Sequence, residues 1–309
     1  MKIYNQRKVP AQGIRPTAVA LGFFDGVHLG HRAVIEAARQ QAEAQGLCLA
    51  VFTFSQPAGQ PVKGRQILTT EQKHELLAQL GVHYCFEPPF ESFMHRTPAQ
   101  FFSQTLVEEY RARALACGDD FFFGAKRAGN TALLKTLSAE AGIALSVVPT
   151  ALYDGQPVSS TRIRAALAVG DIPAANAMLG RPYEINYPVR HGNRIGGRMG
   201  FPTINQVFPD AVQPPAFGVY ITQTVVDGKG WPSATGYGTR PTVDDGAPTC
   251  ETFIPGYEGD LYDKPIRVRF YKKIDTPKKF ESLEALAQAV DGWAAASLHF
   301  FEKEGGHRL

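Results

Sequence analysis

A pair of histidines, His28 and His31, lies in a glycine-containing segment that joins an apolar run to a helical pattern. Glycine lets the main chain pass close to a ligand. A helix that begins at about His31 directs its free N–H groups and the positive end of its dipole into the turn. Both imidazoles can then stabilise negative charge developing on a phosphate. The segment predicts an oxyanion site, with two ordinary histidines beside a turn as the alternative. No third ligand or general-base Glu completes a zinc-protease pattern.

A second segment that suits an anion runs from Val158 to Arg164. Its hydroxyl residues Ser159, Ser160 and Thr161 are typical of a helix N-cap. Arg162 would then lie in the first helical turn, where its guanidinium can reach phosphates bound at the same sheet edge. A purely structural cap is the alternative interpretation of this segment by itself.

A glycine-dense, basic segment from His191 to Asn205 ends with two side-chain oxygens, those of Thr203 and Asn205. A hydroxyl and an amide oxygen are hard ligands that suit a magnesium ion keeping most of its waters. Glycines permit close approach to phosphate. The segment is not a Walker loop, because G-K-[ST] is absent. A hairpin with polar turn residues is the alternative.

Glu251 lies beside Thr252 in an apolar strand pattern. A carboxylate is unfavourable in such a place unless it is paired or used. Glu251 is therefore a candidate catalytic base. A structural carboxylate on a strand is the alternative.

The N-terminal half must place the histidines at one end of a sheet. From about residue 17 to 150, short apolar runs alternate with helical patterns, which predicts an α/β domain around a parallel sheet. Thr69 with Gln72, and Thr97 with Gln100, have the spacing of capping boxes, so helices should start there. The predicted strands are Val19–Phe23, Leu49–Phe54, Tyr84–Phe86, Ala114–Cys117 and Leu145–Val148.

The pattern changes after about residue 185, where Gly and Pro separate β-branched and aromatic runs. Asp227-Gly228 is a hairpin signal, and Ser282 is a plausible N-cap for a final helix. This half predicts a small antiparallel β-barrel closed by a C-terminal helix. The predicted domains are residues 1–182 and 183–309. The predicted strands here are Gly218–Val226, Trp231–Gly238, Glu251–Ile254 and Ile266–Tyr271.

Composition excludes several classes of protein. The 309 residues carry 32 Lys+Arg against 29 Asp+Glu, a net charge of +3, too small for a protein that coats nucleic acid. No apolar stretch has the length of a signal peptide or a membrane span. The four cysteines are scattered without a C-x-x-C pair, which favours a reducing cytoplasm over a disulfide or zinc framework. Neither a nucleic-acid partner nor a membrane is expected.

The motifs together resemble those of a known family. The turn at His28 and the Ser-Ser-Thr-Arg segment resemble the H-x-G-H nucleotidyltransferases, and more closely the bacterial bifunctional riboflavin kinase/FAD synthetase family. Gly200-Phe201-Pro202-Thr203-Ile204-Asn205 resembles the G-x-P-T-A-N motif of its kinase module. The resemblance implies a Rossmann-like nucleotidyltransferase domain. The nucleotide and flavin contacts that it suggests are Gly22, Phe23, Asp25, Gly26, Gly30, Asp120, Ser159, Ser160 and Thr161, and in the second half Gly192, Gly196, Gly200, Pro202 and Arg240.

Three places depart from the family pattern. Ser55-Gln56 stands where a histidine is usual, so no role is assigned there. Ile204 replaces the usual Ala and could crowd the nucleotide slightly. Asp275 and Pro277 replace an Arg and a Glu, which bears on flavin affinity in the kinase half.

The resemblance implies two phosphate-transfer reactions. Riboflavin would be phosphorylated by ATP to FMN and ADP, with Glu251 as base and Mg²⁺ near Thr203 and Asn205. FMN and a second ATP would then give FAD and pyrophosphate, with His28, His31 and Arg162 stabilising charge. Two rivals are a single-activity FAD synthetase with a degenerate barrel and a non-catalytic flavin- or nucleotide-binding protein. A barrel that binds single-stranded RNA is disfavoured, because no clustered aromatic and basic platform is present.

Overall fold

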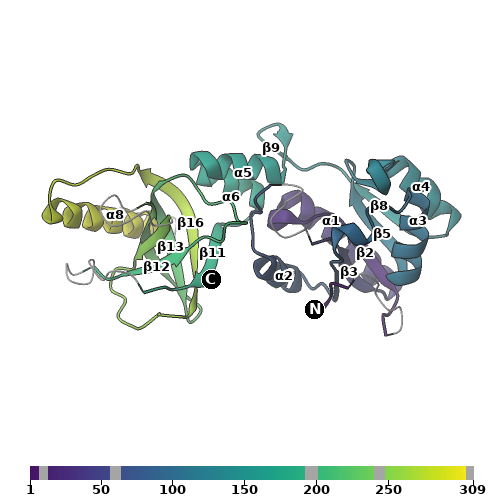
Figure 1. Ribbon diagram of the computed structural model, residues 1–309, viewed down its shortest axis with the longest axis horizontal. Coiled ribbons are helices and arrows are strands. Elements are labelled where there is room, and N and C mark those ends of the chain that lie inside the picture. Colours follow the sequence, from purple (N-terminus) through teal and green to yellow (C-terminus); the bar gives the residue numbers. More distant parts are fainter. Residues whose placement is uncertain (7–12, 56–63, 192–200, 240–247, 304–309) are drawn as a thin grey trace. The chain divides into compact units, whose positions relative to one another are not determined.

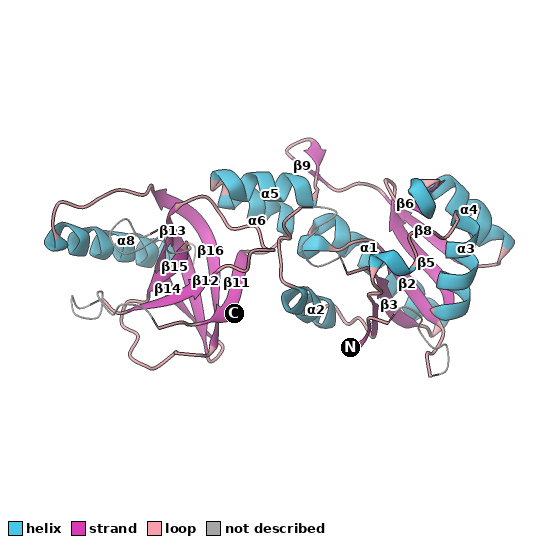
Figure 2. Ribbon diagram, in the orientation of Figure 1, coloured by secondary structure: helices cyan, strands magenta, loops and turns pink. Residues whose placement is uncertain are grey.

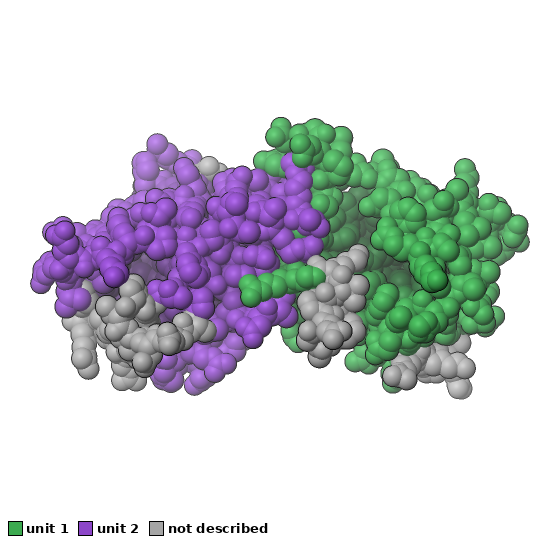
Figure 3. Space-filling view, turned by 45° about the horizontal axis from the view of Figure 1, so that its top comes forward, with its two compact units in different colours: residues 1–160 green, residues 161–309 purple. Residues whose placement is uncertain are grey.

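The computed structural model describes residues 1–6, 13–55, 64–191, 201–239 and 248–303 (Figure 1). These residues form two compact units, Met1–Ser160 and Thr161–Leu309, which Figure 3 distinguishes by colour. Each unit has its own sheet.

The first unit is built on a six-stranded sheet in which all neighbouring strands are parallel. In spatial order the strands are β1 (Lys2–Tyr4), β4 (Tyr84–Phe86), β3 (Cys48–Phe52), β2 (Thr17–Leu21), β5 (Ala112–Gly118) and β8 (Ala144–Val148). All five strands predicted here are present, although β2 and β3 begin and end one or two residues earlier than expected. Strand β1 was not predicted. The α/β class is confirmed.

Helices lie on both faces of this sheet (Figure 2). They are α1 (Leu29–Gln45), α2 (Thr70–Gln79), α3 (Pro98–Gln100), the π-helix η3 (Phe101–Glu109) and α4 (Thr131–Glu140). The short elements are η1 (Asp25–Val27), η2 (Phe90–Ser92), η4 (Ala125–Arg127), β6 (Phe122–Phe123), β7 (Gly129–Asn130), β9 (Leu152–Tyr153) and β10 (Gln156–Pro157). Strands β2 and β3 are buried at every residue, as expected for a sheet covered on both sides.

Both predicted capping boxes are present. The Thr69 hydroxyl accepts the N–H of Gln72 while the Gln72 side chain accepts the N–H of Thr69. Thr97 and Gln100 make the same reciprocal pair at the start of α3. Each box satisfies donors that a helix N-terminus otherwise leaves open.

The second unit contains a six-stranded antiparallel sheet. In spatial order its strands are β11 (Tyr183–Pro188), β16 (Pro265–Asp275), β13 (Gly218–Val226), β14 (Lys229–Gly238), β15 (Thr249–Phe253) and β12 (Thr203–Val207). A bridge between Arg190 and Asn205 brings the two ends of this order together. Asp227 and Gly228 both have positive φ, 50° and 77°, which confirms the predicted hairpin turn. The predicted barrel is confirmed.

The described part of the second unit includes the helices α5 (Ser160–Val169, whose first residue belongs to the first unit), α6 (Ile172–Leu179) and α8 (Leu283–Lys303). The Ser282 hydroxyl accepts the N–H of Ala285 and so caps α8 as predicted, and α8 packs on β13 and β14. Asn176 of α6 donates to the carbonyl of Phe270 at 2.8 Å and accepts the N–H of Tyr183 at 2.6 Å. Helix α6 is thus fastened to β16 and β11.

The interior of the barrel contains a chain of buried hydroxyls from three strands. Thr222 contacts Ser233 and Thr235 at 2.9 and 2.8 Å. Thr224 contacts Ser233, and Thr235 contacts Thr252. Because hydroxyls both donate and accept, such a chain satisfies its members without charge.

Candidate functional site

The turn after β2 has an unusual backbone. Phe24, Gly26 and Val27 have φ values of 56°, 80° and 42°. Glycine adopts this region easily, whereas an aromatic and a β-branched residue do so at a cost of about 1–3 kcal/mol each. Surrounding contacts must therefore hold the turn in place.

Three hydrogen bonds to residues far along the chain hold this turn. The main-chain N–H of Ile67 donates to Oδ1 of Asp25 at 2.8 Å. The hydroxyl of Ser160 donates to the carbonyl of Asp25 at 2.9 Å, and that of Thr53 donates to the carbonyl of Phe23 at 2.8 Å. Asp25 and Ser160, both predicted to contact the nucleotide, thus also fasten the turn that carries the histidines.

The structure brings His28 and His31 together. Their rings stack with centroids 3.6 Å apart and planes inclined by 17°. His28 is the N-cap of α1, and its Nδ1 accepts the N–H of His31 at 3.4 Å. The predicted helix start at about His31 is therefore wrong by two residues, because the imidazole itself serves as the cap. With Nδ1 accepting, a neutral ring carries its proton on Nε2, which is then a donor.

Two glycines leave room for these rings. A Cβ on Gly30 would lie 3.3 Å from the His28 ring, and one on Gly22 would lie 3.1 Å from the Phe24 ring. Phe24 in turn lies 5.1 Å from the ring of His31. A side chain at either place would press on an aromatic ring, so both positions favour glycine. The predicted nucleotide or flavin contacts of Gly22 and Gly30 stay predictions.

The other predicted residues of this site lie at the ends of strands or at the start of α5. Asp120 is exposed and follows β5, at the carboxyl edge of the sheet where α/β proteins bind ligands. Thr161 accepts a hydrogen bond from Arg164 at 3.2 Å. Arg162 lies in the first turn of α5 and within the second unit. That Arg162 acts on the same phosphates as His28 and His31 stays a prediction.

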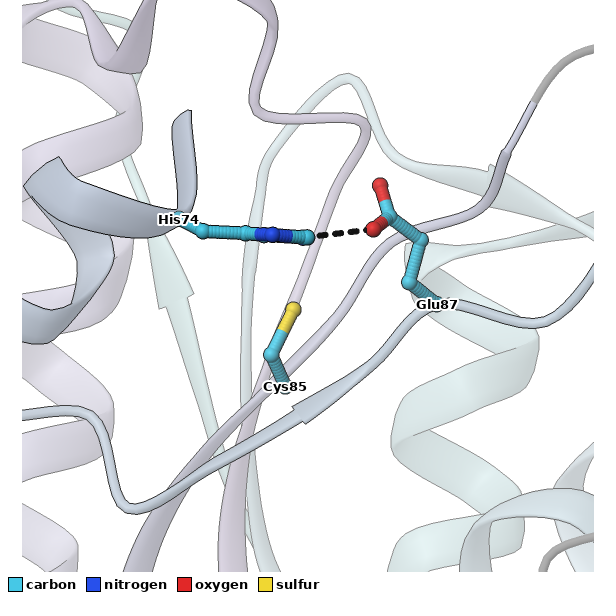
Figure 4. Close-up of side chains that lie close together, drawn as sticks. All are labelled: His74, Cys85 and Glu87. Atoms are coloured by element: carbon cyan, nitrogen blue, oxygen red, sulfur yellow. Dashed lines mark hydrogen bonds and ion pairs between the residues drawn. The ribbon is translucent and has the colours of Figure 1, made fainter. Parts of the chain in front are cut away.

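A charged cluster that the sequence analysis did not identify consists of Lys73 and His74 on α2 and Glu87, the residue that follows β4; Figure 4 shows His74 and Glu87. Glu87 forms an ion pair with Lys73 and accepts a 2.6 Å hydrogen bond from Nε2 of His74. Burial raises the pKa of Glu87, but the contacts with His74 and Lys73 outweigh it and leave the pKa below the ordinary 4.5. The only signal in the sequence was a lysine at helical spacing from Thr69.

This cluster does not have the character of a metal centre. Ligand atoms of His74, Cys85 and Glu87 lie within 4.8 Å of one another, but the ammonium of Lys73 already occupies one oxygen of Glu87. Nε2 of His74 is engaged in the same way, because it donates to the other oxygen of Glu87. The cluster is a buried ion pair that joins α2 to the carboxyl end of β4.

The second candidate site lies on β12 and β15. Asn205 is directly opposite Glu251 in the antiparallel ladder, and Thr203 is opposite Phe253. Since side chains alternate between faces of a strand, Thr203, Asn205 and Glu251 share one face. Asn205 is buried and Glu251 half-buried. The structure therefore brings together the predicted base and a predicted metal ligand.

The carbonyl of Asn205 accepts the N–H of Arg190 at 2.7 Å. In an antiparallel strand the N–H and C=O of one residue point to the same side, so Asn205 and Glu251 form a non-hydrogen-bonded pair. Side chains in such pairs lie closer together than in the alternative type. A hard ligand and a carboxylate at this spacing suit a cation and a general base.

Two of the departures from the family pattern, Ile204 and Asp275, make defined contacts within the protein. Ile204 packs against the apolar cluster of Val189, Val226 and Ile254, on the face opposite Asn205. Because it faces that cluster, its bulk gives no reason to expect crowding on the face that carries Asn205. Asp275 accepts hydrogen bonds from Lys278 at 2.7 Å and the indole of Trp293 at 3.0 Å.

Pro202 is exposed and precedes β12. Gln56 and the predicted contacts Gly192, Gly196, Gly200 and Arg240 lie outside the described residues.

Fold and sites together suit a nucleotide-dependent transferase with two modules: a parallel-sheet domain with two stacked histidines at a helix N-terminus, and an antiparallel barrel in which Asn205 lies opposite Glu251. Comparisons with known proteins specify it further. A family model described as FAD synthetase matches residues 11–162, and one described as riboflavin kinase matches residues 179–297.

Full-length relatives agree with both matches. The bifunctional riboflavin kinase/FMN adenylyltransferase of Pseudomonas fluorescens is 33% identical, covering 92% of each chain. That of Escherichia coli K12 is 32% identical over 97% of this chain and 96% of its own. That of Bacillus subtilis is 32% identical over 92% of each. The chain therefore belongs to the bifunctional riboflavin kinase/FMN adenylyltransferase family.

A solved structure shares the whole fold. A crystal structure described as a macrolide-efflux protein from Streptococcus pneumoniae has a TM-score of 0.85 and 25% identity, covering 96% of this chain and 99% of that one. The efflux activity in that description is attributed to that protein alone. Within the described ranges of this chain, no helix has the length and apolar character needed to cross a membrane.

Proposed function

We propose that this enzyme makes FMN in its second unit and FAD in its first. The residues described for the two candidate sites are the proposed catalytic and binding groups. The observation that carries this proposal is that each unit holds one pair of the candidate residues. The stacked histidines lie in the first unit, and Asn205 lies opposite Glu251 in the second. Riboflavin, FMN, FAD, ATP, ADP and pyrophosphate are the proposed substrates and products.

The kinase step needs a base and a way to bear phosphate charge. Glu251 accepts the proton of the riboflavin 5′-hydroxyl, whose oxygen attacks the γ-phosphorus of ATP while ADP leaves. Glu251 is half-buried on a strand whose neighbouring position, Thr252, is fixed by a 2.8 Å contact with Thr235. The carboxylate is thus held by a rigid element, as positional catalysis requires.

The donor set on β12 fits magnesium. The hydroxyl of Thr203 and the amide oxygen of Asn205 are hard oxygen ligands on one strand face, and a magnesium ion commonly takes only one or two protein ligands besides phosphate and water. When bound, the ion would neutralise charge on the transferring phosphates. Thr203 and Asn205 are the residues proposed to hold it.

The adenylyltransferase step needs no base, since the FMN phosphate is already anionic. Its oxygen attacks the α-phosphorus of ATP and pyrophosphate leaves. His28 and His31 lie at the N-terminal end of α1, where N–H groups and the helix dipole also favour anions. These groups, with Arg162 as a third proposed donor, stabilise charge on the transferring and leaving groups.

The two activities are separable by assay. The full chain is incubated with riboflavin, ATP and magnesium, and the flavins are resolved by chromatography. FMN and FAD both appear if the proposal is right. A second incubation supplies FMN in place of riboflavin. If FMN is converted to FAD but riboflavin is not phosphorylated, the protein is a single-activity FAD synthetase. If flavin binds and neither reaction occurs, it is a flavin-binding protein. The four cysteines are free and buried, which fits the proposed cytoplasmic location.

A further inference from the structure

The two edge strands of the barrel sheet, β11 and β12, are joined in an unusual way. Within the described residues, one main-chain hydrogen bond crosses this seam, from the N–H of Arg190 to the carbonyl of Asn205 at 2.7 Å. Two further hydrogen bonds across or beside this seam come from one side chain. Nε2 of Gln206 donates to the carbonyl of Tyr187 on β11 at 2.6 Å and to that of Ile266 on β16 at 2.7 Å.

The geometry determines the orientation of the Gln206 amide. Both neighbours are carbonyl oxygens, which only accept, so the NH₂ group must face them and uses both of its hydrogens. Tyr187 and Ile266 are themselves directly opposite each other in the β11–β16 ladder. One amide therefore spans a cross-strand pair, and Gln206 is fully buried while it does so.

Gln206 is also adjacent to the proposed magnesium ligand. Side chains alternate along β12, so Gln206 points into the barrel while Asn205 points to the face that carries Glu251. Any outward movement of β12 at Gln206 would lengthen the bond between Arg190 and Asn205 and shift Asn205 against Glu251.

We propose that Gln206 is a positioning residue for the kinase site: its amide closes the seam between β12 and β11 and thereby holds Asn205 opposite Glu251. This inference rests on the proposed function of Asn205 and Glu251. The alternative is that Gln206 stabilises the barrel without affecting the site.

The test uses the full chain with Gln206→Met, which keeps similar volume but removes both donors. Its matched control is Thr224→Val, which removes a buried hydroxyl of the interior network. That hydroxyl contacts Ser233 at 2.9 Å and makes no contact with β11 or β12 among those described above. Gln206→Met loses two buried hydrogen bonds and Thr224→Val loses the contact with Ser233, so both variants should lose stability. Only Gln206→Met touches the seam.

The first readout is hydrogen exchange, which does not depend on activity. The amide of Arg190 should exchange at least about tenfold faster in Gln206→Met, since an opening that costs less free energy occurs more often. The amides of β14 and β15 should lose no more protection than they do in Thr224→Val. Unchanged exchange at Arg190 would overturn the inference.

The second readout is riboflavin phosphorylation at varied magnesium. In Gln206→Met the magnesium concentration for half-maximal rate should rise and kcat should fall by about tenfold or more, with the KM for riboflavin unchanged. Adenylylation of supplied FMN should stay at the wild-type rate. The same kinase changes in Thr224→Val would mean that general loss of stability is responsible, and the positioning role would be rejected. A wild-type chain that phosphorylates no riboflavin would instead refute the proposed kinase function, and hydrogen exchange alone would then decide whether Gln206 closes the seam.

Discussion

His28 accepts the main-chain N–H of His31 through Nδ1, and the two rings stack 3.6 Å apart. One side chain thus serves as a helix cap and as a candidate catalytic donor. This double use means that replacing His28 alters both the stability of α1 and the chemistry at its N-terminus, and the two effects must be separated.

His28→Ala and His31→Ala should each lower FMN adenylylation by about a hundredfold or more, the scale for losing one charge-stabilising donor. Riboflavin phosphorylation should survive in both. His28→Asn is the matched variant, because Asn is a good N-cap and should recover most of the roughly 1 kcal/mol of capping free energy. If His28→Asn also restores adenylylation, His28 acts only as a cap.

Glu251→Gln should depress FMN formation strongly, because it keeps size and hydrogen bonding but removes the base. The KM for riboflavin should change little, and adenylylation of supplied FMN should continue. Steady-state kinetics with each flavin separately measures both. A variant that phosphorylates riboflavin at the wild-type rate would show Glu251 to be a structural carboxylate.

The ion pair at Glu87 predicts a pH dependence for the stability of the first unit. The folded pKa of Glu87 lies below 4.5, so its contribution is complete above the unfolded value and is lost as pH falls through the folded pKa. Glu87→Gln should destabilise the unit at neutral pH by about 3–5 kcal/mol, because Lys73 is left buried and unpaired. The variant should also lack the fall in stability at acid pH that protonation of Glu87 causes in the wild type.

Hydrogen exchange of the β4 amides in both proteins checks this prediction. The difference in protection between wild type and Glu87→Gln should be large at neutral pH and should shrink as the pH falls through the folded pKa of Glu87, which lies below the ordinary value. A difference that stays constant down to strongly acid pH would contradict the assignment of this cluster as an ion pair.

The extent of the barrel domain can be tested with two fragments. Sequence predicts a boundary at 182/183, whereas the compact units divide between Ser160 and Thr161. A fragment of residues 161–309 keeps α6 and its Asn176 contacts with Phe270 and Tyr183. It should fold and convert riboflavin to FMN.

A fragment of residues 183–309 lacks α6, whose buried side chains Ile172, Met178 and Leu179 each contribute about 1.5–3 kcal/mol. It should therefore be less stable by several kcal/mol on that scale. Thermal unfolding by circular dichroism compares the two. Equal stability would favour the boundary at 182/183.

Features set by local chemistry were predictable from sequence. The Thr69–Gln72 capping box and the Asp227-Gly228 turn depend only on neighbouring residues, and both form. The long apolar strands were also predictable, because burial on both faces leaves a continuous apolar run. Family resemblance identified the histidines and Glu251, which periodicity by itself did not distinguish from ordinary residues.

Features set by distant contacts were not predictable. Strand β1 has three residues and exists because it pairs with β4. The position of Asn205 opposite Glu251 depends on strand register across a long connection. Glu87 meets Lys73 only because α2 packs over the end of β4. The start of α1 was missed because histidine is an uncommon N-cap.

The indole of Trp293, which donates to Asp275, has a consequence for spectroscopy. The chain has two tryptophans, Trp231 on β14 and Trp293 on α8, and both lie in the second unit. Tryptophan emission therefore reports the barrel unit alone, while the α/β unit contributes only tyrosine and phenylalanine signals. If the two units unfold independently, emission and far-ultraviolet dichroism will trace different denaturation curves, and their difference isolates the unfolding of the unit that carries the histidines.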